Sequence, residues 1–217
     1  SVTSVGVSAF LGCYGLTSVN TNTYLSNFSL VFPATTVNAL GIQFAFNYAG
    51  EVPVCGRSNL ASVTIGSTIT SIAASAFQGS SNLTTITIPS SVTSVGAYAF
   101  QGCSGLTTII IPSSVTSIGE RSFDGCSGLT SVTIPSSVIS VGNSAFQGCS
   151  GLTSVIVNRY LSNFSSVFPA ATVNAVGLQF TFDYVGAVPV CDARSNLAGV
   201  TFGSTITSIV ASAFQGC

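Results

Sequence analysis

Residues Leu106 to Gly128 read LTTIIIPSSVTSIGERSFDGCSG, and close copies of this stretch follow one another along the chain. The first leucine of the pattern recurs every 23 residues, at Leu60, Leu83, Leu106, Leu129 and Leu152. A unit this short cannot bury a core by itself, so successive units must stack on one another. The period therefore predicts a solenoid whose faces are columns of equivalent side chains.

Within each unit, the alternation of side chains predicts a short strand. Leu106, Ile109 and Ile111 should face the core, whereas Thr108 and Ile110 should face outward. A proline then ends the strand because it has no backbone N–H to donate. We therefore predict a mainly β fold: a right-handed leucine-rich-repeat solenoid of coils of about 23 residues, with short parallel strands and few or no long helices.

One phenylalanine near the end of each unit is expected to fill the wide end of the core. Burial of each ring should stabilise the chain by on the order of 2 to 3 kcal/mol, because it removes a large apolar area from water. Loss of one ring should open a cavity between two coils. The expected column consists of Phe10, Phe77, Phe100, Phe123, Phe146 and Phe214.

The seven cysteines are expected to form a second column. Neighbouring strands lie about 4.8 Å apart, which a disulfide can span, but side chains in one column point in parallel rather than toward each other. Zinc is disfavoured because the chain has no C-x-x-C motif and no histidine. We therefore favour a column of buried thiols over disulfides, and Ser80 replaces the cysteine in one unit. The expected members are Cys13, Cys55, Cys103, Cys126, Cys149, Cys191 and Cys217.

A longer period lies above the 23-residue one. The segment from Tyr24 to Ser29 (YLSNFS) reappears 136 residues later, from Tyr160 to Ser165. The offset then becomes 137, because one residue is inserted near Asp192. About six coils of 23 residues thus form one super-repeat.

We interpret residues 1–217 as one continuous solenoid and as a piece of a longer repeat array. Regular coils are expected at 60–151. Irregular double coils are expected at 16–59 and 152–196, as wider or bulged parts of the same stack. Their strand signal is the alternation of Ile42, Phe44, Phe46 and Tyr48.

The composition excludes several classes of function. Only 4 % of the residues are charged, where about 25 % is usual, and there is no histidine or lysine. Nucleic acid is not an expected partner, because neutralising phosphates needs clustered lysines or arginines. We expect no enzyme activity and no cofactor, because a serine or cysteine nucleophile has no ordinary base here and carboxylates are scarce.

A comparison of the two super-repeats leads to the same expectation. Asp183 corresponds to Asn47, and Glu51 corresponds to Ala187, so no acidic position is shared. A calcium site is therefore not expected. Although 47 % of the residues are apolar, no run approaches the roughly 18 that a membrane-spanning helix requires. This segment is not expected to span a membrane.

A surface with so few charges needs another source of solubility. Either sugars cover its hydroxyl and amide groups, or neighbouring copies of the chain bury much of it. Asn27, Asn163 and Asn82 begin N-x-[ST] sequons. The first two occupy the same site in successive super-repeats and are favoured as glycosylation sites. Asn82 is less favoured, because Leu83 beside it begins a buried strand.

The segments IPSSVTSIG and FDGCSG of the unit that starts at Leu106 closely resemble the BspA-like leucine-rich repeat family. Four uninterrupted units, from Leu60 to Gly151, carry the resemblance, and the irregular coils depart from it. The resemblance implies a bacterial or protist surface protein of a kind often implicated in adhesion to hosts, matrix proteins or other cells. It therefore implies an extracellular or cell-surface location. It supplies no catalytic residues.

Two functions are expected from these observations. The first is an extracellular, glycosylated filament or stalk, in which copies of the chain stack end to end. The second is an adhesin that binds a host surface protein or a glycan through aromatic side chains of the irregular coils, although Tyr48 and Tyr184 are equally suited to the core. The tyrosines considered for this surface are Tyr24, Tyr48, Tyr98, Tyr160 and Tyr184.

A third, remote alternative is an ice-binding surface. The outward hydroxyl groups form rows of the T-x-T type, which a solvated strand face of good β propensity also explains. Ile110, Ile156 and Gly199 break the array. The rows include Ser62 with Thr64, Thr85 with Thr87, and Ser131 with Thr133.

Overall fold

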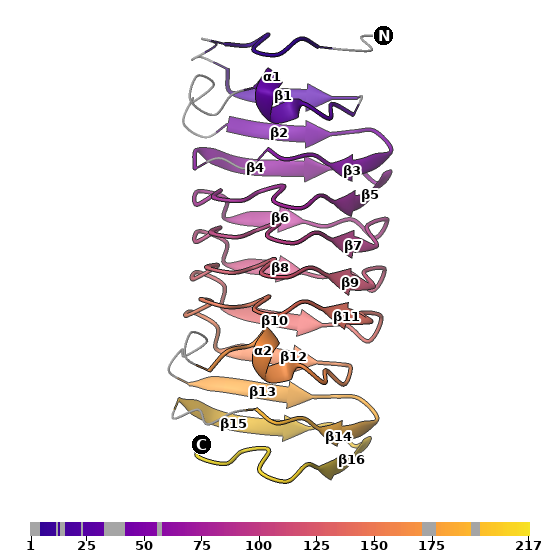
Figure 1. Cartoon of the computed structure of the whole chain (residues 1–217), viewed down its shortest axis with the longest axis vertical. Coiled ribbons are helices and arrows are strands. Elements are labelled where there is room, and N and C mark those ends of the chain that lie inside the picture. The colour runs from indigo at the N-terminus through magenta and orange to yellow at the C-terminus, as the bar shows by residue number, and fades with distance from the viewer. Residues whose placement is uncertain are drawn as a thin grey trace.

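The computed structural model describes residues 5–11, 13, 16–22, 24–32, 42–55, 58–170, 177–191 and 196–217. These residues form an elongated stack of coils, through which the chain advances from one end to the other (Figure 1). The predicted mainly β solenoid of parallel strands is confirmed. The inserted residue expected near Asp192 lies outside the described residues.

Short strands account for most of the regular structure that the described residues form, and the two helices among them have only four residues each. The described elements are β1 (Ser18–Thr21), α1 (Phe28–Val31), β2 (Ile42–Phe46), β3 (Gly50–Val52), β4 (Leu60–Ile65), β5 (Ile69–Ile72), β6 (Thr85–Thr87), β7 (Ser94–Val95), β8 (Thr108–Ile110), β9 (Ser117–Ile118), β10 (Ser131–Ile134), β11 (Ser140–Val141), β12 (Ser154–Val157), α2 (Phe164–Val167), β13 (Leu178–Phe182), β14 (Gly186–Val188), β15 (Leu197–Phe202) and β16 (Ile206–Ile209).

Two parallel sheets run along the stack. One has six strands in the order β15-β13-β12-β10-β8-β6, and the other has five in the order β11-β9-β7-β5-β3. Between β6 and β8 the register places Thr85 opposite Thr108, one 23-residue unit later. Smaller sheets, β1-β2-β4 and β14-β16, continue the same pattern. Each coil therefore supplies the hydrogen-bonding partner of the next.

The core of a regular coil follows the alternation of the sequence. Leu106, Ile109 and Ile111 are buried, whereas Ile110 is 79 % exposed. The ring of Phe123 is fully buried between those of Phe100 and Phe146, with ring centroids 5.1 Å apart on each side. These parallel rings form a continuous stack through the regular coils.

A left-handed residue precedes each of these phenylalanines by two positions. Tyr98 has φ 59°, and Ser144 has φ 56°, a conformation that is strained for residues other than glycine. The turn directs the N–H of Tyr98 to the carbonyl of Glu120 in the next coil, at 2.9 Å. An inter-coil hydrogen bond thus offsets the local strain. The left-handed positions are Ser8, Ser75, Tyr98, Arg121, Ser144 and Ser212.

Close approach of neighbouring coils also explains one recurrent glycine. A Cβ atom on Gly119 would lie 2.3 Å from the backbone nitrogen of Ala97. No side chain fits at that separation. The glycine of the IPSSVTSIG segment is therefore required by the spacing between coils.

The cores of the irregular coils are packed differently from those of the regular coils. In the second of them, the short helix α2 directs Phe164 into the core, where its ring lies 5.1 Å from those of Phe168 and Phe180. The sequence patterns did not predict this helix. A register shift between Leu178 and Gln179 marks a bulge where β13 pairs with β15, and β2 has the same shift where it pairs with β4. The extent of the irregular double coils, 16–59 and 152–196, stays a prediction.

Candidate binding surface on the irregular coils

Few titratable side chains of the described residues lie close together. Within the described ranges, no group of three or more His, Cys, Asp or Glu residues could hold a metal ion. Arg121 Nε lies 3.9 Å from Glu120 Oε1, and Arg121 Nη1 lies 3.9 Å from Asp124 Oδ2. The Arg121 side chain is 43 % exposed. Such exposed pairs contribute little to stability. Nothing in this arrangement resembles paired acid–base groups.

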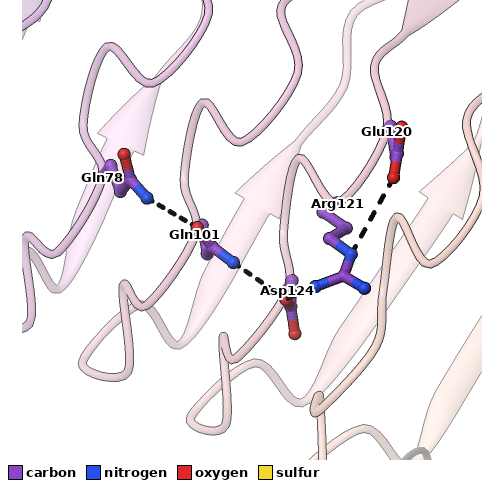
Figure 2. A network of polar contacts seen from close by, with 5 residues as sticks. All are labelled: Gln78, Gln101, Glu120, Arg121 and Asp124. Carbon is purple, nitrogen blue, oxygen red and sulfur yellow. Dashed lines mark hydrogen bonds and ion pairs between the residues drawn. The ribbon is translucent and has the colours of Figure 1, made fainter.

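A row of polar side chains crosses three coils (Figure 2). Gln78 Nε2 donates to Gln101 Oε1 at 2.6 Å, and Gln101 Nε2 donates to Asp124 Oδ2 at 3.0 Å. Because the Asp124 carboxylate only accepts, it orients the Gln101 amide and, through it, that of Gln78. The row aligns neighbouring coils and carries no reactive group.

All seven cysteines, which lie within the described ranges, are thiols rather than disulfides. In the regular coils, Cys126 Sγ donates to the carbonyl of Phe100 at 3.2 Å, and Cys103 and Cys149 make the equivalent bonds. Burial raises the pKa of Cys103 and Cys149 to about 12. A thiolate is therefore disfavoured in this column, and the thiols act as core side chains.

Cys55 and Cys191 do not lie in the same column. The N–H of Cys55 donates to the carbonyl of Ala76, just as the N–H of Phe77 donates to that of Ala99. Cys55 thus occupies the phenylalanine position. Cys191 does the same, because its N–H donates to the carbonyl of Ala213 at 2.9 Å. Their assignment to the cysteine column is corrected. The helical turn of each irregular pair also places a ring in the core, Phe28 in the first pair and Phe164 in the second.

The phenylalanine row has members that the pattern missed. The Phe168 ring lies 4.8 Å from that of Phe146 with an interplanar angle of 9°, so it continues the stack into the second irregular coil. Phe32 stacks on Phe10 in the same way, at 4.5 Å. Phe214 is half-buried and lies against Phe202 at 6.2 Å. The spacing of 22 residues between Phe146 and Phe168 could have revealed the missing member.

Many outward hydroxyl groups are engaged with the backbone. Thr130 Oγ1 donates to the carbonyl of Thr107 at 3.3 Å, and Thr153 donates to that of Thr130 at 3.2 Å. In the T-x-T rows, Thr85 lies opposite Thr108, but Thr87 lies opposite the exposed Ile110. Part of the hydroxyl content therefore stabilises the stack itself.

The three sequon asparagines differ in their surroundings. Asn163 Nδ2 donates to the carbonyl of Val141 at 2.8 Å, and Asn27 Nδ2 donates to that of Val5 at 3.2 Å. Asn82 is exposed, although Leu83 beside it is buried. The side-chain nitrogens of Asn27 and Asn163 are thus bonded to the backbone, whereas Asn82 is exposed at the surface.

The tyrosines of the irregular coils divide into core and surface. Tyr184 is buried and its hydroxyl donates to the carbonyl of Ala187 at 2.9 Å, as that of Tyr48 does to Glu51 at 3.1 Å. Tyr160 is 46 % exposed and packs edge-on against Tyr184, with ring centroids 6.2 Å apart. Tyr98, in a regular coil, is partly exposed.

Tyr160 borders a groove of about 460 Å³ beside α2. A larger hollow of about 540 Å³ near the first described coil is lined by Phe10 and Phe32 among others, and none of its described lining residues is titratable. The groove beside α2 is the better candidate site, because an exposed aromatic ring borders several polar side chains. Its lining consists of Tyr160, Ser162, Asn163, Ser165, Ser166, Pro189, Val190, Val210 and Ala211.

Known proteins similar to the chain share its fold. The family model described as BspA type leucine rich repeat region matches in six copies, over residues 1–103, 54–170 and 105–217. A leucine-rich repeat protein of T. pallidum is 23 % identical, with a TM-score of 0.53, over 78 % of this chain and 73 % of that one. One from Bacteroides ovatus is 19 % identical, with a TM-score of 0.52, over 100 % of this chain and 80 % of that one.

A third solved structure, a leucine-rich repeat protein of Eubacterium ventriosum, is 19 % identical with a TM-score of 0.52, over 99 % of this chain and 74 % of that one. At these identities the likeness concerns the fold alone. No curated protein matches the chain. Neither short helix, nor any other in the described part of the chain, is long and apolar enough to cross a membrane.

Proposed function

Because the chain belongs to the BspA-type leucine-rich repeat family, we propose that it is a non-enzymatic segment of a cell-surface protein, in which a stiff rod presents the irregular coils to a binding partner. The observation that carries this proposal is the exposed Tyr160 at the edge of the groove beside α2. Exposed aromatic side chains next to a hollow are typical of binding sites.

The regular coils suit the role of a spacer. Their stacked rings and in-register strands make each coil a template for the next, so the unit resists bending between neighbours. Their exposed faces are mostly short hydroxyl side chains, many of them bonded to the backbone. Such a surface offers few anchors for a partner, which concentrates recognition on the irregular coils.

Attachment of coated beads to target surfaces tests this proposal. The whole chain is coupled to beads, and binding to host cells, matrix proteins and immobilised glycans is counted. Tyr160→Ala should reduce attachment by about tenfold, because removal of a central aromatic anchor typically costs more than 1 kcal/mol. Ile139→Ser, which changes a 67 % exposed side chain of a regular coil, should leave attachment unchanged. An equal loss of attachment in both variants, or no loss in either, contradicts the proposal.

A filament or stalk is the second candidate function. The pairings β2–β4 and β13–β15, which lie at equivalent points of the two super-repeats, share the same register and the same bulge. Further super-repeats, or further copies of the chain, can therefore extend the rod by the same contacts, about 4.8 Å for each coil. Negative-stain microscopy of concentrated protein should show fibres of uniform width. Dispersed particles of single-chain length at high concentration contradict this function.

Glycosylation is part of the same proposal, and its support now favours a different sequon. Asn82 is exposed, whereas Asn27 and Asn163 use their side-chain nitrogens within the fold. Intact-mass measurement of native protein should reveal an added glycan that peptide mapping assigns to Asn82. An unmodified mass, or a glycan on Asn163 alone, contradicts this assignment.

A further inference from the structure

The described lining of the groove beside α2 carries no charge. Five of the nine described lining residues present hydroxyl or amide groups. A charged ligand would lose its hydration without gaining a counter-charge, which is costly. The volume of about 460 Å³ lies within the range of small-molecule sites. The chemistry therefore suits a neutral and hydroxylated ligand.

The aromatic edge of the groove is preorganised. The Tyr160 ring rests edge-on against Tyr184 at an interplanar angle of 67°, and the Tyr184 hydroxyl is fixed to the Ala187 carbonyl at 2.9 Å. A supported ring loses little freedom when a ligand packs on it. Beside it, Val190 is 46 % exposed and widens the apolar surface. A flat apolar face of a ligand can rest here.

The polar edge is also ordered. Asn163 Nδ2 donates to the Val141 carbonyl at 2.8 Å and lies 3.3 Å from Asn143 Oδ1, so its side-chain oxygen is the group left to accept. Ser165 Oγ donates to the Val190 carbonyl at 2.8 Å, which leaves its lone pairs as acceptors. Acceptors fixed in this way match a ligand that carries hydroxyl donors.

The first super-repeat lacks this combination at the equivalent place. There the Tyr24 hydroxyl donates to Glu51 Oε1 at 3.0 Å, whereas the second super-repeat has Ala187 in place of Glu51. Leu30 likewise stands where the second has Ser166. At these described positions the two irregular coils therefore differ in charge and polarity, and Tyr24 provides a natural control.

We propose that the groove between Tyr160 and Ser165 binds a short neutral carbohydrate, whose C–H face packs on the Tyr160 ring and whose hydroxyl groups meet the serine and asparagine oxygens. This inference rests on the proposed function and names the ligand class of the same surface. The equivalent place in the first super-repeat does not bind it, because Glu51 holds the Tyr24 hydroxyl and Leu30 removes a polar group.

Titration of the whole chain with defined oligosaccharides tests the inference. The probes are cellotetraose, maltotetraose and chitotetraose, with a sulfated tetrasaccharide and an uncharged glycine–serine octapeptide for comparison. Tyrosine fluorescence reports binding directly, since the chain has six tyrosines and no tryptophan. At least one neutral tetrasaccharide should bind saturably, and neither the sulfated probe nor the peptide should compete with it.

Matched variants locate the site. Tyr160→Ala should weaken binding about tenfold, and Tyr24→Ala should change it less than about twofold. Ala187→Glu leaves the Tyr160 ring in place but supplies the carboxylate that holds Tyr24 in the first super-repeat, so it should also weaken binding. Circular dichroism verifies that each variant is folded.

The inference is overturned if no neutral tetrasaccharide binds, if the peptide or the sulfated probe binds instead, or if Tyr24→Ala weakens binding as much as Tyr160→Ala. These results are separate from the bead assay. Loss of attachment in Tyr160→Ala without saccharide binding overturns only the carbohydrate assignment. Saccharide binding at Tyr160 with undiminished attachment supports that assignment and overturns the proposed function.

Discussion

In the regular coils a single phenylalanine ring per coil fills the wide end of the core, whereas the second irregular pair fills it with a cluster. Phe123 is stacked between parallel rings at 5.1 Å. Phe164 instead meets Phe180 edge-on, at 5.1 Å and 80°, and lies 5.5 Å from Phe182. Parallel stacked rings can be repeated by each further coil, whereas the edge-on rings of the cluster contact one another within one irregular pair.

Phe123→Ala, in the stack of the regular coils, should reduce the free energy of unfolding more than any other substitution considered below. The ring is fully buried between two others, so its loss leaves a cavity and should lower the free energy of unfolding by about 3 to 5 kcal/mol. Urea unfolding followed by circular dichroism measures the change. Phe123→Leu, which retains most of the apolar volume, should cost clearly less. A loss below about 1 kcal/mol for the alanine variant would show that the stack can collapse around the gap.

Alkaline pH should destabilise the fold through its buried thiols. Burial raises the pKa of Cys103 and Cys149 from 9.0 to about 12, so the folded chain keeps protons that the unfolded chain releases above pH 9. The stability from each thiol is therefore complete below about pH 9 and falls above it, by up to about 1.4 kcal/mol per pH unit. Burial likewise raises the pKa of Tyr184 above 10.0, so this phenol should add a similar loss of stability at higher pH.

Urea unfolding at pH 8, 9 and 10 tests the alkaline effect. Cys126→Ser should reduce the slope of the unfolding free energy against pH by the contribution of one thiol. The fold should accept this serine, because Ser80 already occupies the equivalent position in another coil. An unchanged slope in that variant would contradict the role of the buried thiols.

Cys191→Phe tests why the irregular coils carry a small side chain in the phenylalanine row. If the cluster around Phe164 already fills the space, an added ring should overpack the core and cost about 1 to 3 kcal/mol. Thermal unfolding compares it with Cys191→Val, a change of similar volume that should cost less than about 1.5 kcal/mol. A phenylalanine variant as stable as the parent would mean that the missing ring leaves usable space.

The smallest effects should have opposite signs in the two kinds of coil. Ser144 and Ser166 each precede a stacked phenylalanine by two positions, but Ser144 has φ 56° and Ser166 lies in α2. Ser144→Gly should stabilise by up to about 1 kcal/mol by relieving strain, whereas Ser166→Gly should destabilise by about 0.5 kcal/mol. Calorimetric melting of both variants gives the comparison. A stability change of the same sign in both variants would contradict the left-handed backbone at Ser144 and the helical backbone at Ser166.

Much of this architecture was accessible from the pattern. The alternation around Leu106 predicted which side chains of β8 are buried, because strand geometry forces neighbouring residues to opposite faces. The candidate surface was accessible only in part. The repeated YLSNFS segment indicated a special site, but its helix, its groove and the exposure of Tyr160 depend on contacts with coils that are distant in sequence.

The assignment of Cys55 shows where pattern matching stops. Cysteine recurs in the regular units, so the pattern placed Cys55 and Cys191 with them. Their backbone hydrogen bonds put them in the phenylalanine row instead. Similarly, the repetition of the Asn27 and Asn163 sequons suggested exposure, whereas their amides are bonded to the preceding coil. Repetition in sequence marks equivalent sites without saying which atoms they contact.

The 23-residue period was enough to establish a stacked parallel solenoid, because units too small to bury a core leave no other arrangement. Charge composition was enough to make nucleic-acid binding and acid–base catalysis unexpected. The packing between coils decided the rest. Which ring fills a given level, which thiol is buried and which tyrosine reaches solvent depend on the volume left by residues from neighbouring coils, and no local pattern records that volume.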